Sequence, residues 1–155
     1  MRIAFALIAA ASLAGLAGCA ATYKAPTALN IGATEKFTQN RPELFKAARR
    51  ALVADGNQIL SADEPSGTIS TVARDYRLTP ETADCGTTMG IDYLMDNRTS
   101  GKLAWGLIVD DGRIEVRAQL QAEYKPGAID QNITLTCSSR GVLEQQLAAR
   151  IRQLL

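Results

Sequence analysis

The side chains that could carry chemistry in this chain are thiols, hydroxyls and carboxylates, because its 155 residues include no histidine. Serine and cysteine nucleophiles usually depend on an imidazole base, and imidazole is also the commonest zinc ligand. The hydroxyl pair Ser138-Ser139 precedes a predicted helix, and the carboxylate pair Asp110-Asp111 lies in a predicted turn. Both pairs therefore have structural explanations. We therefore expect no enzyme, no cofactor and no metal site, although the sequence offers three candidates: Cys85, Ser138-Ser139 and Asp110-Asp111.

The first residues have the layout of a secretory signal. Arg2 gives an early positive charge, an apolar stretch rich in alanine and leucine follows, and it ends in Leu16-Ala17-Gly18-Cys19. The apolar stretch from Ile3 to Ala17 has fifteen residues, fewer than the ~20 that a helix needs to cross a bilayer. An ordinary cleaved signal, in which the cysteine is incidental, is the alternative.

The segment Leu16-Ala17-Gly18-Cys19 resembles the lipobox of bacterial lipoproteins. This resemblance implies that residues 1–18 are removed as a signal peptide and that Cys19 is acylated. Two or three acyl chains would hold a small domain on a membrane essentially permanently. Ala20 after the cysteine favours the periplasmic side of the outer membrane over the inner membrane, so the expected partner is a membrane, reached through the lipid anchor at Cys19.

With Cys19 bearing lipid, Cys85 and Cys137 remain as an even pair in an oxidising compartment. We expect a structural disulfide between them. It would close a loop of about 50 residues, worth at most roughly 4 kcal/mol in the chain-entropy model. Two buried free thiols or a redox pair are the alternatives, although redox cysteines usually lie close together in sequence.

The remaining chain is predicted to form a tether and one domain. Residues 19–39, which carry the lipidated end and include Pro26 and Gly32, have no sustained periodicity and are expected to be a flexible tether. Residues 40–155 suffice for a single globular domain. Removing Arg2 from the 17 basic residues leaves 16, against 16 acidic residues, and this balance argues against a nucleic-acid partner.

Two helices are expected at the ends of this domain. The first begins at Asn40, which can cap it, and closes at Asp55-Gly56. The second begins near Gly141, with Glu144 placed to accept a hydrogen bond from an early backbone N–H. Its buried stripe is predicted to be Leu143, Leu147, Ile151 and Leu154.

Strands are expected between the helices. Asp111-Gly112 predicts a two-residue type I′ hairpin turn, which pairs Val109 with Ile114 and Leu103 with Leu120. That register leaves Arg113, Glu115 and Arg117 on the polar face. Residues 75–101 are less regular, but alternation at Ile91, Tyr93 and Met95 predicts a strand there. The other expected strands are 58–62, 68–73 and 133–137.

These elements predict an α+β fold, in which an antiparallel sheet of about five strands carries both helices on one face. The arrangement and the run from Cys137 to Glu144 resemble small, largely uncharacterised periplasmic lipoproteins of proteobacteria. The general shape also resembles helix-on-sheet domains of lipoprotein subunits in outer-membrane assembly machinery. This resemblance assigns no functional residue to the chain.

Two functions remain open. The first is a non-catalytic structural or accessory module of the cell envelope, with Arg113, Glu115 and Arg117 as the interaction surface for another envelope protein, although the same side chains can be merely solvated. The second is a lipoprotein that binds a lipid or small hydrophobic ligand between its helices and its sheet. The alanine-rich helices could leave such space, but they equally permit close packing.

Overall fold

The computed structural model of the chain describes residues 23–27, 32–127 and 131–155. The predicted signal peptide, residues 1–18, and the predicted lipidation residue Cys19 lie outside the described residues. Within the described ranges, no helix is both long enough and apolar enough to cross a membrane.

Helix α1 (Arg41–Ala54) begins and ends where the sequence predicted. Asn40 caps it, because its side chain accepts a hydrogen bond from the backbone N–H of Glu43 at 3.1 Å. Asp55 is the C-cap, and Gly56 follows with a φ of 75°, a conformation that favours glycine. The helix buries its apolar face completely: Leu44, Ala48, Ala51 and Leu52 have no exposed surface.

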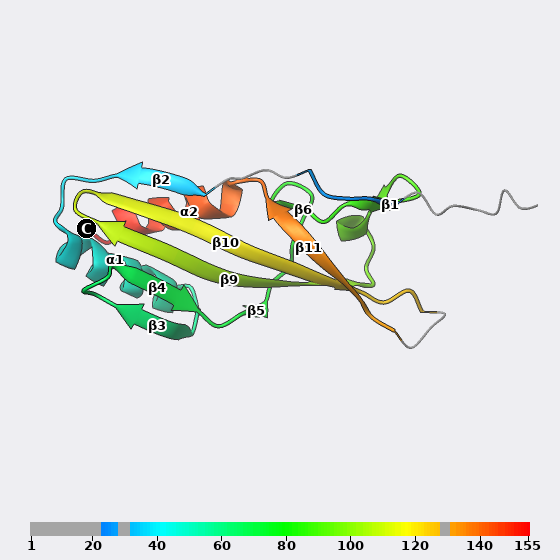
Figure 1. Cartoon of the computed structure of the whole chain (residues 1–155), viewed down its shortest axis with the longest axis horizontal. Coiled ribbons are helices and arrows are strands. Elements are labelled where there is room, and N and C mark those ends of the chain that lie inside the picture. The colour runs from blue at the N-terminus through cyan, green and yellow to red at the C-terminus, as the bar shows by residue number, and fades with distance from the viewer. Residues whose placement is uncertain (1–22, 28–31, 128–130) are drawn as a thin grey trace, which may run out of the picture.

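A hairpin of two twelve-residue strands, β9 (Thr99–Asp110) and β10 (Arg113–Tyr124), runs along most of the length of the molecule (Figure 1). Its register is the predicted one, with Val109 opposite Ile114 and Leu103 opposite Leu120. Within the turn, only Gly112 has a positive φ, so the predicted type I′ geometry was wrong. Tertiary contacts explain the difference, since the Asp111 carboxylate accepts from the Arg41 N–H at 2.9 Å.

The fold class expected from the sequence was wrong. Across the described residues the structure is mostly β, with one sheet of eight strands, a second sheet of three, and two α-helices. The larger sheet has the order β3-β4-β9-β10-β11-β6, with β2 against β10 and β5 against β9. Its other strands are β2 (Ala33–Lys36), β3 (Ile59–Asp63), β4 (Thr68–Thr71), β5 (Arg74–Asp75), β6 (Ala83–Asp84) and β11 (Ile133–Ser139).

The small sheet consists of β1 (Tyr23–Lys24), β7 (Thr87–Thr88) and β8 (Ile91–Asp92), in the order β1-β7-β8. The short 3-10 helix η1 (Tyr93–Met95) follows it directly, in place of the longer strand that the alternation predicted. Strands of two residues are too short to show periodicity in the sequence, and β1, β5 and β6 exist here because distant segments pair with them. For this reason the predicted number of strands was too low.

Two parts of the segment expected to be a tether pair with the domain. Tyr23 and Lys24 lie opposite Thr88 and Thr87 in the small sheet. The strand Ala33–Lys36 pairs with the first residues of β10 in the larger sheet. In these two segments the chain is therefore part of the folded β-structure.

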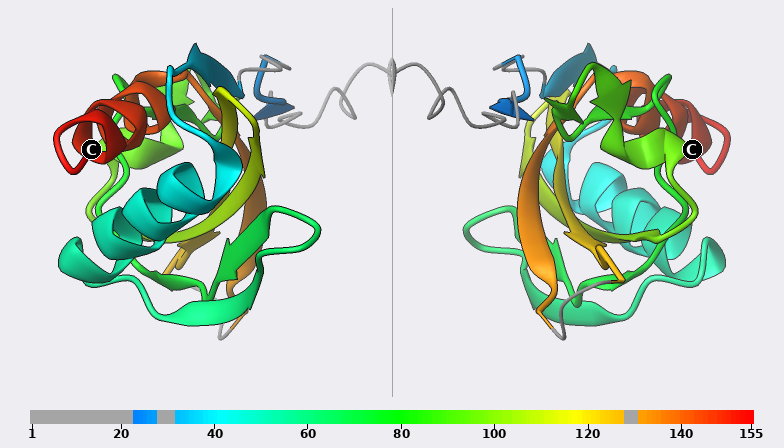
Figure 2. Two further views of the ribbon diagram at one scale, coloured as in Figure 1. Left: turned by 90° about the vertical axis from the view of Figure 1, so that its left-hand side faces the viewer. Right: turned by 90° about the vertical axis from the view of Figure 1, so that its right-hand side faces the viewer.

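Both helices lie on the concave side of the larger sheet, which curves around them (Figure 2). Helix α2 (Val142–Arg152) packs with Leu143, Leu147 and Ile151 toward the sheet, but Leu154 lies past the end of the helix and is partly exposed. The core consists of these residues, the apolar side of α1 and the inward side chains of the long hairpin. The inward side chains of β10 are Ile114, Val116, Leu120 and Ala122.

Candidate functional site

The predicted interaction residues Arg113, Glu115 and Arg117 lie on β10, and together with Asp110 at the end of β9 they form what we define as the charged patch. Arg113 bonds to Asp110 at 2.5 Å, and this hydrogen bond raises the pKa of the guanidinium above its ordinary value. Arg117 forms an ion pair with Glu115. Since each arginine is paired with a carboxylate, the net charge of the patch is close to zero, but positive and negative charges alternate along it.

Strand β2 extends this patch on the adjacent side. Lys36 lies opposite Arg113 and Thr34 lies opposite Glu115. On the other side of β10, Glu115 faces Ile108, a large apolar residue that is 43% exposed. The charged patch therefore lies beside an exposed apolar side chain, at the end of the hairpin that carries the turn (Figure 1).

Cys85 and Cys137 are joined in a disulfide, the pairing that the sequence predicted. Both cysteines are buried, so the candidate thiol at Cys85 is part of a covalent cross-link. Cys85 directly follows β6 and lies two residues before β7, whereas Cys137 is in β11. The bond therefore ties the segment entering the small sheet to the larger sheet.

A set of aromatic and charged side chains holds the small sheet and η1 against the ends of β9 and β10. The ring of Tyr93 packs between those of Tyr23, at 6.5 Å, and Tyr124, at 5.1 Å between centroids. The guanidinium of Arg98 lies 5.0 Å from the Tyr124 centroid. The hydroxyl of Thr99 donates to the Tyr93 carbonyl at 2.6 Å.

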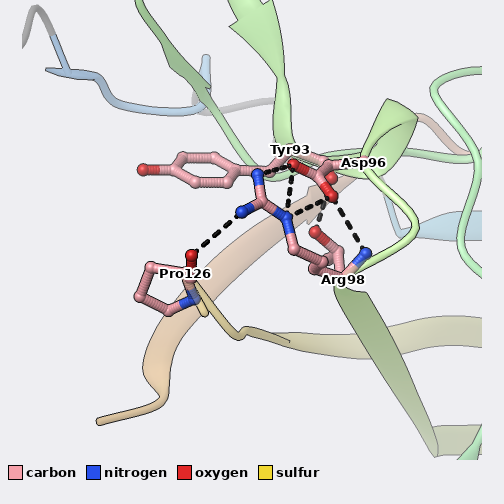
Figure 3. Close-up of polar contacts among 5 residues, drawn as sticks. Tyr93, Asp96, Arg98 and Pro126 are labelled. Carbon is pink, nitrogen blue, oxygen red and sulfur yellow. Dashed lines mark hydrogen bonds and ion pairs between the residues drawn. The ribbon is translucent and has the colours of Figure 1, made fainter. Parts of the chain in front are cut away.

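Arg98 also connects η1 to the loop that follows β10 (Figure 3). Its Nη2 bonds to the Asp96 carboxylate at 2.6 Å, and its Nη1 donates to the Pro126 carbonyl at 2.9 Å. The side-chain hydrogen bond from Arg98 is the main cause that lowers the pKa of Asp96 to about 2. The aromatic contacts, Arg98 and the disulfide together fix the small sheet relative to the rest of the molecule.

The small sheet and the adjoining helix η1 expose apolar side chains that the sequence did not reveal as a group. Tyr23, Met89, Ile91 and Met95 are 55%, 76%, 62% and 72% exposed. A turn could have been predicted at Met89-Gly90, because glycine there follows two threonines that favour a strand. The strand β1 that completes this sheet had no comparable signal, since it is only two residues long.

A pocket of about 320 Å³ lies beside α2, strands β5 and β9, and the residues that directly follow α1. Trp105, Leu103 and Leu147 are among its apolar residues, and Asp55 and Arg150, 3.7 Å apart, stand among its polar ones. Five of its ten lining residues carry charged or amide side chains, so the pocket is more polar than a typical site for a small hydrophobic ligand. The sequence placed a hydrophobic ligand between the helices and the sheet, whereas no residue of α1 lines this pocket.

Glu144 is a buried carboxylate, and the prediction that it accepts from an early backbone N–H of its own helix was wrong. Glu144 has no exposed surface, and it accepts from the Ser139 hydroxyl at 2.7 Å and from the Ala118 N–H at 3.2 Å. The Ser139 oxygen in turn accepts from the Gly141 N–H at 3.0 Å, directly before α2. Ser139 and Glu144 therefore stabilise the start of a helix and its contact with β10, which is a structural role.

Metal ligands do not gather anywhere in the described part of the chain, where no three histidine, cysteine or acidic side chains lie close enough to hold an ion.

No family model matches this chain, and no curated protein matches it. Among solved structures, it is similar to a TBP-like protein from Parabacteroides distasonis ATCC 8503, with a TM-score of 0.45 and 15% sequence identity. The alignment covers 68% of this chain and 64% of that one, so this chain spans less than two thirds of the other's length. A likeness this remote assigns neither a fold nor a function.

Proposed function

We propose that this chain is a lipoprotein on the periplasmic side of the outer membrane, anchored through Cys19, that acts without catalysis by presenting a surface to another envelope protein. The lipobox-like segment Leu16-Ala17-Gly18-Cys19 supports the anchor. The pairing of Tyr23 and Lys24 with β7 supports a domain that begins next to the anchor. A domain attached in this way would keep a defined orientation relative to the membrane.

The observation that carries the interaction role is the charged patch at the end of the β9–β10 hairpin. Its four charges lie on a long hairpin supported on both sides by other strands, so their positions are set by the backbone. The patch lies at the opposite end of the molecule from β1, on the side that would face away from the membrane (Figure 1). Charge patterns of this kind select partners and set their register more than they add affinity.

Intact-mass analysis of the mature protein tests the anchor. We expect the mass of a chain that begins at Cys19 with added acyl groups, and a further increase of two hydrogens after reduction of the disulfide. A chain with an unmodified cysteine at position 19 would contradict the anchor.

Photo-crosslinking in living cells tests the interaction surface, with a photoreactive residue replacing Glu115 or Arg117. The matched control replaces Leu60, which is 69% exposed on β3. We expect a discrete adduct from the charged patch that is absent from the control.

The double substitution Glu115→Arg and Arg117→Glu keeps an ion pair but exchanges the positions of its positive and negative charges. We therefore expect it to prevent an adduct formed from a probe at Arg113. Identical adducts from all positions would refute a specific surface.

The pocket beside α2 and β9 supports a second candidate, the binding of a lipid or small hydrophobic ligand. Trp105 is the single tryptophan of the chain and lines this pocket, so its fluorescence reports occupancy directly. We expect medium-chain fatty acids to shift the emission of Trp105 in a saturable way. Leu147→Phe would fill part of the space without adding a second tryptophan, so we expect it to weaken that saturable response, and a wild-type protein that never responds would exclude this candidate.

A further inference from the structure

The structure points to a second contact with the membrane, in addition to the lipid anchor. We propose that the exposed apolar side chains of the small sheet and the adjoining helix η1, Tyr23, Met89, Ile91 and Met95, insert into the interfacial region of the lipid bilayer. This inference rests on the proposed acylation of Cys19, because the anchor supplies the membrane. The occupant that we assign to this surface is therefore lipid.

The strand pairing places two of these side chains on one face. Tyr23 lies opposite Thr88, and Thr88 lies opposite Ile91. Residues directly opposite each other in an antiparallel sheet direct their side chains to the same side. Tyr23 and Ile91 therefore flank a small threonine on the same face, with a tyrosine of the kind that favours membrane interfaces.

The turn between β7 and β8 holds a methionine in a conformation that methionine disfavours. Met89 has a φ of 52° and Gly90 a φ of 78°, so both central residues of this two-residue turn have positive φ. Glycine, asparagine and aspartate are the usual residues there, because a bulky side chain at positive φ is strained. The chain nevertheless places a large apolar side chain at this position and exposes 76% of it to solvent. A strained residue of this kind points to a function outside the folded core.

The methionines add a second argument. The sequence has three methionines, at positions 1, 89 and 95, and removal of residues 1–18 leaves only Met89 and Met95. Both are at this end of the molecule, and both are more than 70% exposed. Methionine is flexible and polarizable, and proteins use it on surfaces that must adapt to varied apolar partners.

The distance from the anchor decides which partner this surface meets. Only four residue steps separate Cys19 from Tyr23, and a fully extended chain covers about 14 Å over that length. The acyl chains on Cys19 would lie in the bilayer, so Tyr23 cannot be farther than that from the membrane surface. Because the disulfide and Arg98 fix the small sheet to the larger one, the whole domain would be oriented by this contact.

Quenching by brominated lipids tests the proposal in the full mature lipoprotein. The protein would carry Met89→Trp and be reconstituted into phosphatidylcholine vesicles whose acyl chains are brominated near the headgroup. The matched control is Leu60→Trp, an equally exposed apolar position on β3 at the other end of the molecule (Figure 1). Trp105 is buried in both variants and contributes the same background.

We expect the emission of Met89→Trp to shift to shorter wavelength and to be strongly quenched, while that of Leu60→Trp is unchanged. Met95→Trp provides a second quenching measurement if Met89→Trp folds poorly, because Met95 lies in η1 and does not have a positive φ. We expect the same quenching at this position. Vesicle flotation separates the two proposals. A protein that floats with the vesicles but is not quenched at position 89 or 95 would overturn the docking while retaining the anchor. Equal quenching at positions 60 and 89 would do the same. A protein that does not float would refute the acylation itself.

Discussion

The buried carboxylate of Glu144 allows the most specific prediction from the structure. Strand β10 pairs with β2 over Arg113–Val116 and with β11 over Leu120–Tyr124. In the described chain, neither pairing reaches Ala118, and its N–H donates to Glu144 at 3.2 Å instead. A helix side chain thus supplies the acceptor that a neighbouring strand would otherwise provide.

The substitution Glu144→Ala removes two hydrogen bonds from a group without exposed surface. A buried donor left without an acceptor costs about 1–3 kcal/mol, and the Ser139 hydroxyl can recover part of this by rotating. We therefore expect the free energy of unfolding to fall by about 2–4 kcal/mol, where many domains have only 5–15 kcal/mol in total. Glu144→Gln keeps the volume and one acceptor, so we expect it to lose roughly half as much.

Urea denaturation of an exported Cys19→Ala protein, followed by Trp105 fluorescence, measures both effects. The double-mutant cycle with Ser139→Ala isolates the hydrogen bond between Ser139 and Glu144, which lie in contact at 2.7 Å. We expect the two losses to be non-additive by about 1 kcal/mol. Gln146→Ala is a control, because Gln146 lies on the same helix and lines the pocket. A loss below about 1 kcal/mol for Glu144→Ala, or strict additivity with Ser139→Ala, would refute the bridging role.

Three further predictions follow from the small sheet and its attachments. Replacing Cys85 and Cys137 together by alanine should lower the free energy of unfolding by at most about 4 kcal/mol, because the bond spans 52 residues, and urea denaturation with and without reductant checks this. Met89→Gly should raise the free energy of unfolding by up to about 1 kcal/mol, and with it the thermal midpoint, because glycine accepts positive φ. The same substitution should weaken the contact with the membrane. Asp96 has its pKa lowered to about 2 by Arg98, so its contribution to stability is present above its ordinary pKa and is lost as pH falls from about 4 toward 2. Asp96→Asn should lack that part of the acid-induced loss, and equal acid profiles for both proteins would contradict it.

Local patterns in the sequence were sufficient for several elements. Asn40 with Glu43, and Asp55 with Gly56, determined both ends of α1, because helix caps are satisfied by residues within one turn. Alternation of apolar and polar residues determined the register of the long hairpin, because a shift by one residue would turn its apolar side chains toward solvent.

The candidate site was predictable only in part. The positions of Arg113, Glu115 and Arg117 on the polar face followed from the alternation, but their ion pairs depend on side-chain geometry. The exposed apolar residues of the small sheet could not be grouped from the sequence. Tyr23 and Ile91 are 68 positions apart, and only the two pairings of Thr88 bring them to one face.

The sequence by itself determined the ends of α1, the register of the hairpin and the pairing of Cys85 with Cys137, since each depends on neighbouring residues or on a small number of possible partners. The tertiary structure decided the short strands, the geometry of the turn at Asp111 and the partners of Glu144. Those features depend on hydrogen-bonding groups that the folded chain brings together from distant segments. A backbone N–H such as that of Ala118 has the same chemistry in every residue, so its acceptor becomes known only when the surrounding elements have packed.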